Sequence, residues 1–404
     1  MQNPLLPALH EAIRWCTFQR TSAGKPLRHG RLVQPTGESS LSEEAHAAFA
    51  GNMHTAYKHA ILRKYLPVWM QILASNNRTI GYVDCYAGPG VYPDGSDGSP
   101  LIALDIAEKK SKTDGCGVWC VFNEHDQGLA RRLQESVGLR SYRERTLIFS
   151  LDAKDLLDHL LMDSRFAEDG RLSVPMFFFI DPFGLNVPMQ MLKRIMEQPK
   201  TEILLTFMIK DVVRWSRTSG YEHIMMDLFD HPDPLSLIEQ AEGSDYEQRA
   251  VNAFVNRLKV HAGVKHVIKY RICSQRERRT LFYLVHGSNH FKGFKLMKGI
   301  MYNLGIPGAF AYLGPGHPLQ GQTFLTDQLE QGEIESLANY LVGKYTGMTR
   351  SFGFILEANY AEVSGIEKHF RRAVLVLERR GKVEISGEKR RKGTLKEDHE
   401  VRFL

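Results

Sequence analysis

Three acidic residues each follow an apolar, strand-like segment of the chain. They are Asp84, Glu124 and Asp152. In an open parallel sheet the carboxyl ends of the strands share one edge, and ligands bind outside that edge. We expect Asp84 to accept hydrogen bonds from a cationic ligand head, Glu124 to accept the two hydroxyls of a ribose, and Asp152 to meet an adenine amino group. The alternative for each acid is that it caps the helix that follows.

A glycine-bearing turn follows Asp84 directly, in Tyr86-Ala87-Gly88-Pro89-Gly90. Gly88 and Gly90 have no Cβ atom, so the backbone here can approach a ligand closely. We therefore assign Tyr86, Gly88 and Gly90 to the same nucleoside-cofactor site. Two glycines at this spacing are also typical of a tight loop between a strand and a helix.

A second polar turn, Asp181-Pro182-Phe183-Gly184, ends the apolar run 177–180. As a catalytic residue, Asp181 would orient or partly deprotonate an acceptor group. Phe183 would offer a stacking face to a base that has been flipped out of its helix. The alternative is a strand-ending turn in which the aspartate binds backbone amides.

Strand-like and helical segments alternate along the first half of the chain. We expect helices at 53–73, 101–110, 127–136, 153–162 and 188–197, and strands at 80–84, 118–123, 146–150, 176–180 and 202–207. This alternation predicts a parallel sheet covered on both faces. A helix at 246–261 follows, and then two strand-like runs at 266–272 and 280–286, which predict an antiparallel hairpin.

Five parallel strands closed by an antiparallel hairpin are the plan of class I S-adenosylmethionine-dependent methyltransferases. A dinucleotide-binding dehydrogenase would not end in this way. The sequence therefore predicts an α/β fold with a Rossmann-like class I methyltransferase sheet, and S-adenosylmethionine as the cofactor of the acidic edge. Methyl transfer itself requires mainly alignment of the acceptor and exclusion of water.

Lys58 and His59 lie on the helix that precedes the first strand, close enough in sequence to fold over the cofactor pocket. Lys58 can pair with the carboxylate of the cofactor, and its alternative is a solvent-facing lysine. We expect Arg214, His286 and Asn289 to border the same rim.

The chain resembles the three-Cys-motif partner (TcmP) family over most of residues 53 to 303. The resemblance rests on Tyr82-Val83-Asp84-Cys85-Tyr86-Ala87-Gly88-Pro89-Gly90, Gly98-Ser99-Pro100-Leu101-Ile102-Ala103-Leu104, Phe179-Ile180-Asp181-Pro182-Phe183-Gly184, and Phe282-Tyr283-Leu284-Val285-His286-Gly287-Ser288-Asn289-His290 with Lys292-Gly293-Phe294. It implies a methyltransferase-like domain. It also implies a separate partner protein that carries three cysteines and is similar to radical S-adenosylmethionine iron–sulfur proteins.

The order of Lys58-His59, the glycine turn and a later Asp-Pro-aromatic sequence is similar to bacterial adenine-N6 methyltransferases that act on large-subunit ribosomal RNA. This resemblance implies that Asp181 and the Pro182 carbonyl accept protons of an exocyclic amine, while Phe183 stacks on the base. The second proline of that family is missing here, and Phe183 stands one position early. The identity of the acceptor base therefore stays open.

The character of the sequence changes after residue 327. We divide the chain into an N-terminal arm or cap (1–50), a methyltransferase-like domain (51–305), a linker (306–327) and a winged-helix-like module (328–404). Helices at 332–344 and 364–380 precede two strand-like runs near the C-terminus. Around them stand basic residues that can neutralise phosphates of a nucleic acid, namely Arg379, Arg380, Lys389, Arg390, Arg391 and Lys392. The alternative is a solvated charged hairpin.

The formal net charge of +6 favours an anionic partner. Five scattered cysteines argue against a disulfide framework, and we predict no metal site. No apolar stretch approaches the roughly 20 residues that span a bilayer, and no signal peptide is recognisable, so we expect a cytoplasmic protein.

The sequence thus predicts a methyltransferase that acts on a nucleic-acid base, with N-methylation as one outcome, and the TcmP resemblance implies that it works with a three-cysteine iron–sulfur partner. The alternative is a non-catalytic partner protein that docks an iron–sulfur enzyme onto nucleic acid. A small-molecule or protein acceptor is a third possibility.

Overall fold

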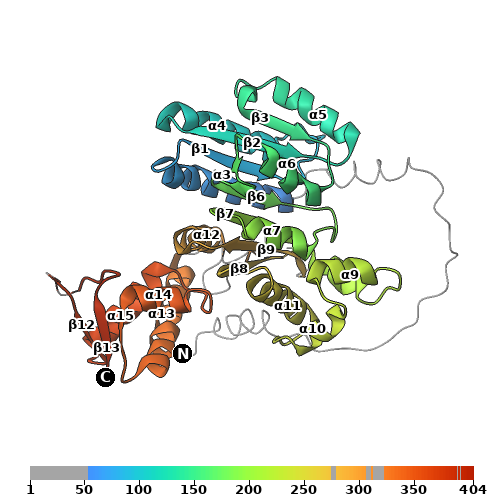
Figure 1. Ribbon diagram of the computed structural model, residues 1–404. Coiled ribbons are helices and arrows are strands. Elements are labelled where there is room, and N and C mark those ends of the chain that lie inside the picture. Colours follow the sequence, from blue (N-terminus) through green and yellow to red (C-terminus); the bar gives the residue numbers. More distant parts are fainter. Residues whose placement is uncertain (1–52, 274–278, 306–310, 313–322, 389, 392) are drawn as a thin grey trace.

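The computed structural model describes residues 53–273, 279–305, 311–312, 323–388, 390–391 and 393–404 (Figure 1). The predicted N-terminal arm, residues 1–50, lies outside this part of the chain. Within it, one large sheet of eight strands has the order β10-β8-β9-β7-β6-β1-β2-β3. Its strands are β1 (Thr79–Asp84), β2 (Gly117–Asn123), β3 (Thr146–Phe149), β6 (Met176–Ile180), β7 (Thr201–Phe207), β8 (His266–Cys273), β9 (Thr280–Ser288) and β10 (Ala311–Tyr312).

The sheet confirms the α/β, Rossmann-like prediction. β1 pairs in parallel with β2 and β6, β2 with β3, and β6 with β7. β8 and β9 form the expected antiparallel hairpin, and β9 inserts between β7 and β8. Since β9 is antiparallel to both neighbours, β8 runs in the same direction as the five strands before it.

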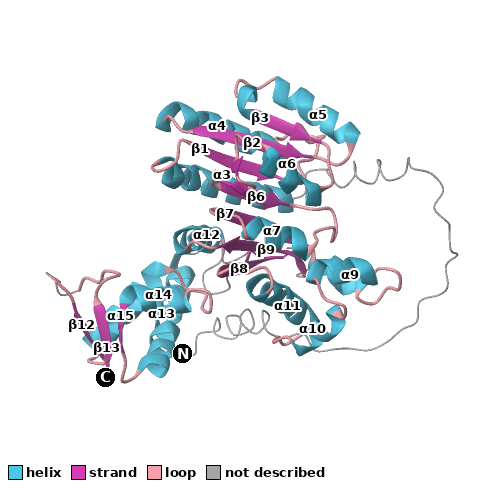
Figure 2. Cartoon of the chain, in the orientation of Figure 1, coloured by secondary structure: helices cyan, strands magenta, loops and turns pink. Residues whose placement is uncertain are grey.

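Helices cover both faces of this sheet (Figure 2). They are α3 (Met53–Ala74), α4 (Ser99–Asp114), α5 (Gln127–Gly138), α6 (Leu156–Met162), α7 (Met189–Met196), α8 (Ile209–Trp215), α9 (Glu222–Phe229), α10 (Pro234–Gln240), α11 (Tyr246–Val260) and α12 (Phe291–Leu304). Short 3₁₀ turns at Arg143–Arg145 and Ala153–Asp155 and a small hairpin of β4 (Ala167–Glu168) and β5 (Arg171–Leu172) complete this part.

The aromatic run in β6 is buried because successive side chains point to opposite faces of the sheet. Phe177 and Phe179 join the core beneath α3, α4 and α12. Phe178 joins the second core, beneath α6, α7 and α11. Each fully buried phenylalanine contributes about 2–3 kcal/mol through removal of apolar surface from water. These two cores fix the sheet edge on which the candidate site stands.

The C-terminal residues form a second, three-stranded sheet with three helices. The elements are α13 (Thr323–Tyr345), β11 (Thr349–Ser351), α14 (Phe352–Asn359), α15 (Glu367–Arg379), β12 (Val383–Ser386) and β13 (Glu400–Phe403). β13 pairs antiparallel with both β11 and β12. We call these elements the C-terminal module.

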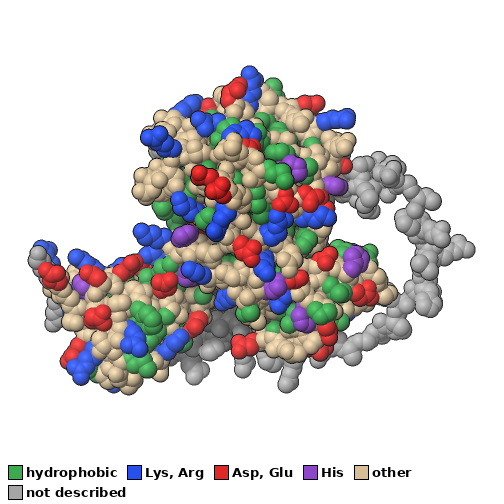
Figure 3. All heavy atoms as spheres, viewed as in Figure 1, with side chains coloured by type: hydrophobic (Ala, Val, Ile, Leu, Met, Phe, Trp, Pro, Cys, Tyr) green, Lys and Arg blue, Asp and Glu red, His purple; other side chains and the backbone are tan. Residues whose placement is uncertain are grey.

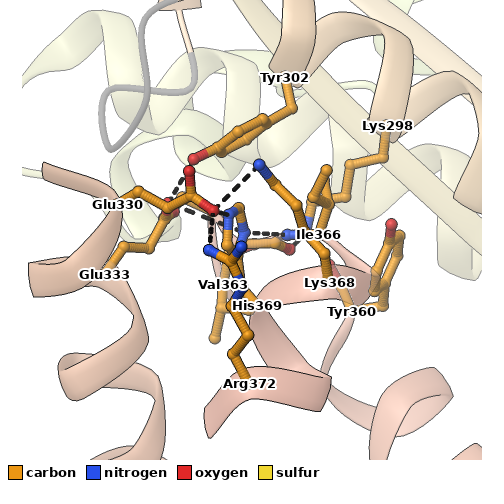
Figure 4. Close-up of polar contacts among 12 residues, drawn as sticks. Lys298, Tyr302, Glu330, Glu333, Tyr360, Val363, Ile366, Lys368, His369 and Arg372 are labelled. Carbon is orange, nitrogen blue, oxygen red and sulfur yellow. Dashed lines mark hydrogen bonds and ion pairs between the residues drawn. The ribbon is translucent and has the colours of Figure 1, made fainter. Parts of the chain in front are cut away.

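The C-terminal module packs on α12, and its core is continuous with the core beneath α3 and α4. Phe294 of α12 meets Tyr360 edge to face, with ring centroids 5.8 Å apart. The ammonium of Lys298, also on α12, donates to the carbonyls of Tyr360, Val363 and Gly365 at 2.5–2.7 Å (Figure 4). The module is therefore held to α12 by apolar packing and by a buried cation.

Parts of the predicted linker, 306–327, belong to regular elements. Ala311 and Tyr312 pair in parallel with β8, and α13 begins at Thr323, before the predicted module boundary at 328. Residues 306–310 and 313–322 lie outside the described residues. Across the described helices, none combines the length and apolar character needed to cross a membrane.

Candidate cofactor and acceptor site

The ends of β1, β2 and β6 meet at one edge of the large sheet. Because these strands are parallel neighbours, their arrowheads point the same way in Figure 2. β1 ends at Asp84, Glu124 follows β2, and Asp181 follows β6. The structure therefore brings these three predicted residues to the same edge.

Asp84 is completely buried, with 0% of its surface exposed. Its carboxylate accepts hydrogen bonds from the Tyr82 hydroxyl at 3.2 Å, from the Tyr86 backbone N–H at 3.4 Å and from the Ser99 side chain. Burial raises the pKa of Asp84 to about 7, and the nearby Asp181 carboxylate acts in the same direction, against the hydrogen bond from Ser99. No ion pair to Asp84 occurs within the described ranges. A cation placed beside this carboxylate would favour its ionised form.

Glu124 is also buried and binds two backbone N–H groups. Oε2 accepts from Gly88 at 2.8 Å, and Oε1 accepts from Asp126 at 2.9 Å. Burial raises the pKa of this carboxyl, and the two backbone hydrogen bonds oppose that effect. Glu124, which follows β2, thus holds the glycine turn that follows β1.

The two turn glycines adopt backbone conformations that other residues rarely adopt. φ is 64° at Gly88 and 81° at Gly90. A Cβ on Gly90 would lie 3.0 Å from Leu133 Cδ1, so packing against α5 also requires glycine there. The Gly98 N–H donates to the Gly90 carbonyl at 2.7 Å and closes the loop before α4. The glycine turn is therefore fixed by backbone hydrogen bonds and by its packing against α5.

Asn123, which our sequence analysis missed, connects three strand ends. Its Nδ2 donates to the carbonyls of Cys85 at 3.2 Å and Leu151 at 3.1 Å, and its Oδ1 accepts from the Leu151 N–H. It is 1% exposed. An amide side chain at the end of an otherwise apolar strand is the signal that marks it.

Asp152 follows the alternative interpretation, since it caps the helical turn after it. Its side chain accepts from the Lys154 backbone N–H at 3.4 Å and pairs with the Lys154 ammonium at 3.3 Å. Tyr86 turns toward the other side of the site, and its hydroxyl donates to the Asn186 carbonyl at 2.5 Å. Burial is the main cause of a raised pKa at Tyr86, and the charges of Cys85 and Asp152 act in the same direction.

Lys58 pairs with Asp181 across the top of the sheet edge. This contact brings the N-terminal part of α3 beside the end of β6. The Lys58 side chain is only 12% exposed, and its ammonium lies 5.3 Å from the centre of the Phe282 ring, so the solvent-facing alternative is wrong. The neighbouring His59 is buried, and burial together with the charge of Lys58 lowers its pKa to about 4.

The turn Asp181-Pro182-Phe183-Gly184, which we call the acceptor turn after its predicted role, follows β6 and has one buried and one exposed ring. Pro182 is buried, whereas Phe183 is 58% exposed. φ is 81° at Gly184, the position that ends the turn. An exposed phenylalanine two residues after Asp181 is an arrangement that would allow stacking on a base.

His286 and Asn289 do not border this rim, contrary to our expectation. β9 runs antiparallel to β7, so its last residues lie beside the first residues of β7, with Ser288 opposite Glu202. There His286 Nε2 lies 3.1 Å from Glu202 Oε2, and the Tyr65 hydroxyl donates to the same oxygen. These residues form a buried cluster at the opposite edge of the sheet.

The predicted nucleic-acid residues of the C-terminal module differ in their surroundings. Arg380 forms two hydrogen bonds with Glu335, at 2.7 and 2.8 Å, and Arg390 pairs with Glu378 at 2.7 Å. Figure 3 shows basic and acidic side chains intermingled on this module. Two further members of the set, Arg379 and Arg391, are exposed, and Lys389 and Lys392 lie outside the described residues. Because Arg380 and Arg390 are neutralised by acids, they fit a structural role better than phosphate binding.

No family model matches this sequence, and no curated protein matches it. Among solved structures, a protein from Legionella pneumophila is similar at 12% identity and a TM-score of 0.39, over 66% of this chain and 95% of that chain. The N-terminal domain of human METTL16 in complex with SAH is similar at 11% identity and a TM-score of 0.29, over 57% of this chain and 70% of that chain. Likeness at these scores carries no functional argument, and the TcmP relationship stays a resemblance.

Proposed function

We propose that this protein is an S-adenosylmethionine-dependent methyltransferase that acts on a nucleic-acid base. The observation that carries the proposal is the pair of buried carboxyls, Asp84 and Glu124, which among the described residues bind only N–H and O–H donors, beside the glycine turn. Burying an acid without a cation costs free energy, so such an arrangement is typical of a ligand site. The acceptor turn stands at the same edge.

The donor and acceptor groups present fit the proposed cofactor. Asp84 would bind the ammonium of its methionine part, Glu124 its ribose hydroxyls, and the Gly88 and Gly90 backbone would line it. Tyr86 and Asp152 would border its adenine, and Lys58 lies close enough to this edge to meet its carboxylate. When bound, S-adenosylmethionine supplies an electrophilic methyl group.

The chain's own residues would then orient the acceptor and exclude water. Lys58 contacts Oδ2 of Asp181, and we assign Oδ1 to the exocyclic amine of the acceptor base. The Pro182 carbonyl would accept the second proton of that amine, and Phe183 would stack on the ring. N-methylation is the reaction that this set of acceptors supports best.

Three further assignments belong to the same proposal. The order of one helix, a strand, two helices and two strands in the C-terminal module supports a winged helix. The three-cysteine iron–sulfur partner and the cytoplasmic location rest on the resemblance and on sequence composition.

A second candidate function is a non-catalytic partner protein that docks an iron–sulfur enzyme onto nucleic acid. The ion pair between Lys58 and Asp181 favours this docking function, because the lysine occupies an oxygen of the predicted catalytic carboxylate. The missing second proline favours it as well.

The test is transfer of radiolabelled methyl from S-adenosylmethionine to mixed cellular RNA and DNA by the purified chain. We expect incorporation by the wild type and a loss of about 100-fold or more in Asp181→Ala, the range of general acid–base effects. Asp169→Asn, at an exposed turn between β4 and β5, is the matched control and should keep full activity. Cofactor binding without transfer to any nucleic acid, with or without an added partner, would instead support the docking function.

A further inference from the structure

The surface beside the acceptor turn is aromatic and basic, and apart from Phe183 it lies outside the residues assigned to the cofactor and the acceptor base. It consists of Phe183, the α8 helix and the segment that leads from α8 to α9. The side chains that define this α8 surface are Phe183, Arg214, Trp215, Arg217 and Tyr221.

Trp215 connects the acceptor turn to α8. A Cβ on Gly184 would lie 3.5 Å from Trp215 Cη2, so the indole packs directly against the residue that follows Phe183. On its far side Trp215 stacks on Tyr221, with ring centroids 4.8 Å apart and planes 24° apart. Phe183 and Tyr221 are 58% and 37% exposed. Aromatic rings therefore continue from the acceptor turn along the surface.

Two exposed arginines accompany these rings. The guanidinium of Arg214 lies 5.9 Å from the Trp215 ring centre, and that of Arg217 lies 6.0 Å from the Tyr246 ring centre. Neither arginine forms an ion pair in the part of the chain that the structure describes. The nearest acid on the helix, Asp211, has its pKa raised by burial, an effect that the charges of Arg214 and Lys210 partly oppose.

The position of this surface decides which nucleotides it can reach. Along one strand of a duplex, successive phosphates are about 3.4 Å apart along the helix axis. The phosphates on either side of a flipped base therefore stay within a few ångströms of it. Figure 1 shows β12 and β13 at the opposite end of the molecule from α9. Cations that hold the nucleotides next to the acceptor must therefore come from elements near the acceptor turn.

We infer that the α8 surface binds the single-stranded segment of nucleic acid that flanks the acceptor base, with the exposed rings stacking on bases and Arg214 and Arg217 binding phosphates. Stacking on aromatic side chains combined with backbone cations is the usual mode of single-strand binding. This inference rests on the proposed function, since it names the substrate segment of the same site.

The test measures binding of fluorescein-labelled 20-nucleotide single strands, RNA and DNA of mixed sequence, by anisotropy across a salt series. We expect Arg214→Gln with Arg217→Gln to weaken binding tenfold or more and to lower the salt slope by about 1.4, the value for two lost phosphate contacts on a single strand. Tyr221→Ala should weaken binding about fivefold or more and leave the salt slope unchanged, because stacking carries no charge.

The matched control is Arg131→Gln with Arg132→Gln, which removes two exposed arginines of α5 that belong to neither the α8 surface nor the C-terminal module. We expect it to leave affinity for these short strands within twofold. Binding that is unchanged in the α8 double variant but lost in this control would overturn the inference. A wild-type protein that binds S-adenosylmethionine but no single strand would overturn it together with nucleic acid as the substrate, whereas a protein that binds strands through the α8 surface but no S-adenosylmethionine would contradict only the proposed methyltransferase.

Discussion

Acids at the sheet edge and acids in the C-terminal module have opposite surroundings. Asp84 and Glu124 are buried, and in the part of the chain that the structure describes they accept hydrogen bonds only from neutral donors. In the C-terminal module Glu330 lies within 3.2 Å of Lys368, His369 and Arg372 (Figure 4). Although burial raises the pKa of Glu330, its hydrogen bond with Lys368 and the three positive charges lower it overall.

This difference separates a ligand site from a structural contact. A charged side chain that is already paired within the protein contributes to stability or to packing, and its remaining attraction for a charged ligand is weak. A buried charge without a cation destabilises the folded protein and persists where a ligand supplies the missing charge. The sheet edge is therefore the better candidate for chemistry, and the paired part of the C-terminal module is the better candidate for structure.

The largest expected effect is a pH dependence of stability that belongs to Asp84. The pKa of Asp84 is about 7 in the folded state, above the ordinary value of 3.8. As the pH falls, the folded protein therefore binds this proton before the unfolded chain does. The free energy of unfolding should fall as pH rises from about 4 to about 7, by about 1 kcal/mol per pH unit, and level off above that. Urea unfolding of wild type and Asp84→Asn across this range measures it. A difference between the two that does not vary with pH would show that Asp84 has an ordinary pKa.

A smaller loss of stability is expected from Lys298→Met. This lysine is 1% exposed, and burial lowers its pKa to about 7. Methionine keeps the apolar stem but leaves three buried carbonyls without their donor, which costs about 2 kcal/mol net of the relieved desolvation. Thermal unfolding measures the loss, and cofactor affinity should stay within twofold. A large loss of affinity in the folded variant would show that the two regions are coupled.

The smallest effect is expected from Arg380→Ala. Its ion pair with Glu335 is exposed, and such pairs contribute about 0.5 kcal/mol or less. Chemical unfolding should detect almost no change, and single-strand binding should be unaffected. A tenfold loss of nucleic-acid affinity would restore Arg380 to the phosphate-binding set and break the comparison.

Sequence reasoning located the sheet and much of its edge. Strand ends are readable because buried parallel strands are continuous apolar runs, which is how Asp84, Glu124 and Asp181 were placed. His286 was misplaced because the expected antiparallel hairpin fixes the direction of β9 relative to β8 alone, whereas the position of His286 depends on the antiparallel pairing of β9 with β7. Ion pairs such as Lys58 with Asp181 join residues 123 positions apart in the chain, and a linear pattern carries no signal for them.

The C-terminal basic residues show the same limit. A run of arginines looks the same in sequence whether or not acids neutralise it. Only the packing of α13 against α15 brings Glu335 to Arg380, which changes the interpretation of that residue. Asn123 was missed for a related reason. Its hydrogen bonds connect the ends of three strands, and these ends lie close together only in the folded protein.

The most direct test of the ligand-site interpretation is a calorimetric titration of S-adenosylmethionine into the wild type, Asp84→Asn and Arg380→Ala at pH 8. We predict binding by the wild type, a loss of about 100-fold, or about 2.7 kcal/mol, in Asp84→Asn, and no change in Arg380→Ala. Equal affinity in all three proteins, or no binding by any of them, would contradict the claim that the unpaired acids of the sheet edge hold a cationic cofactor.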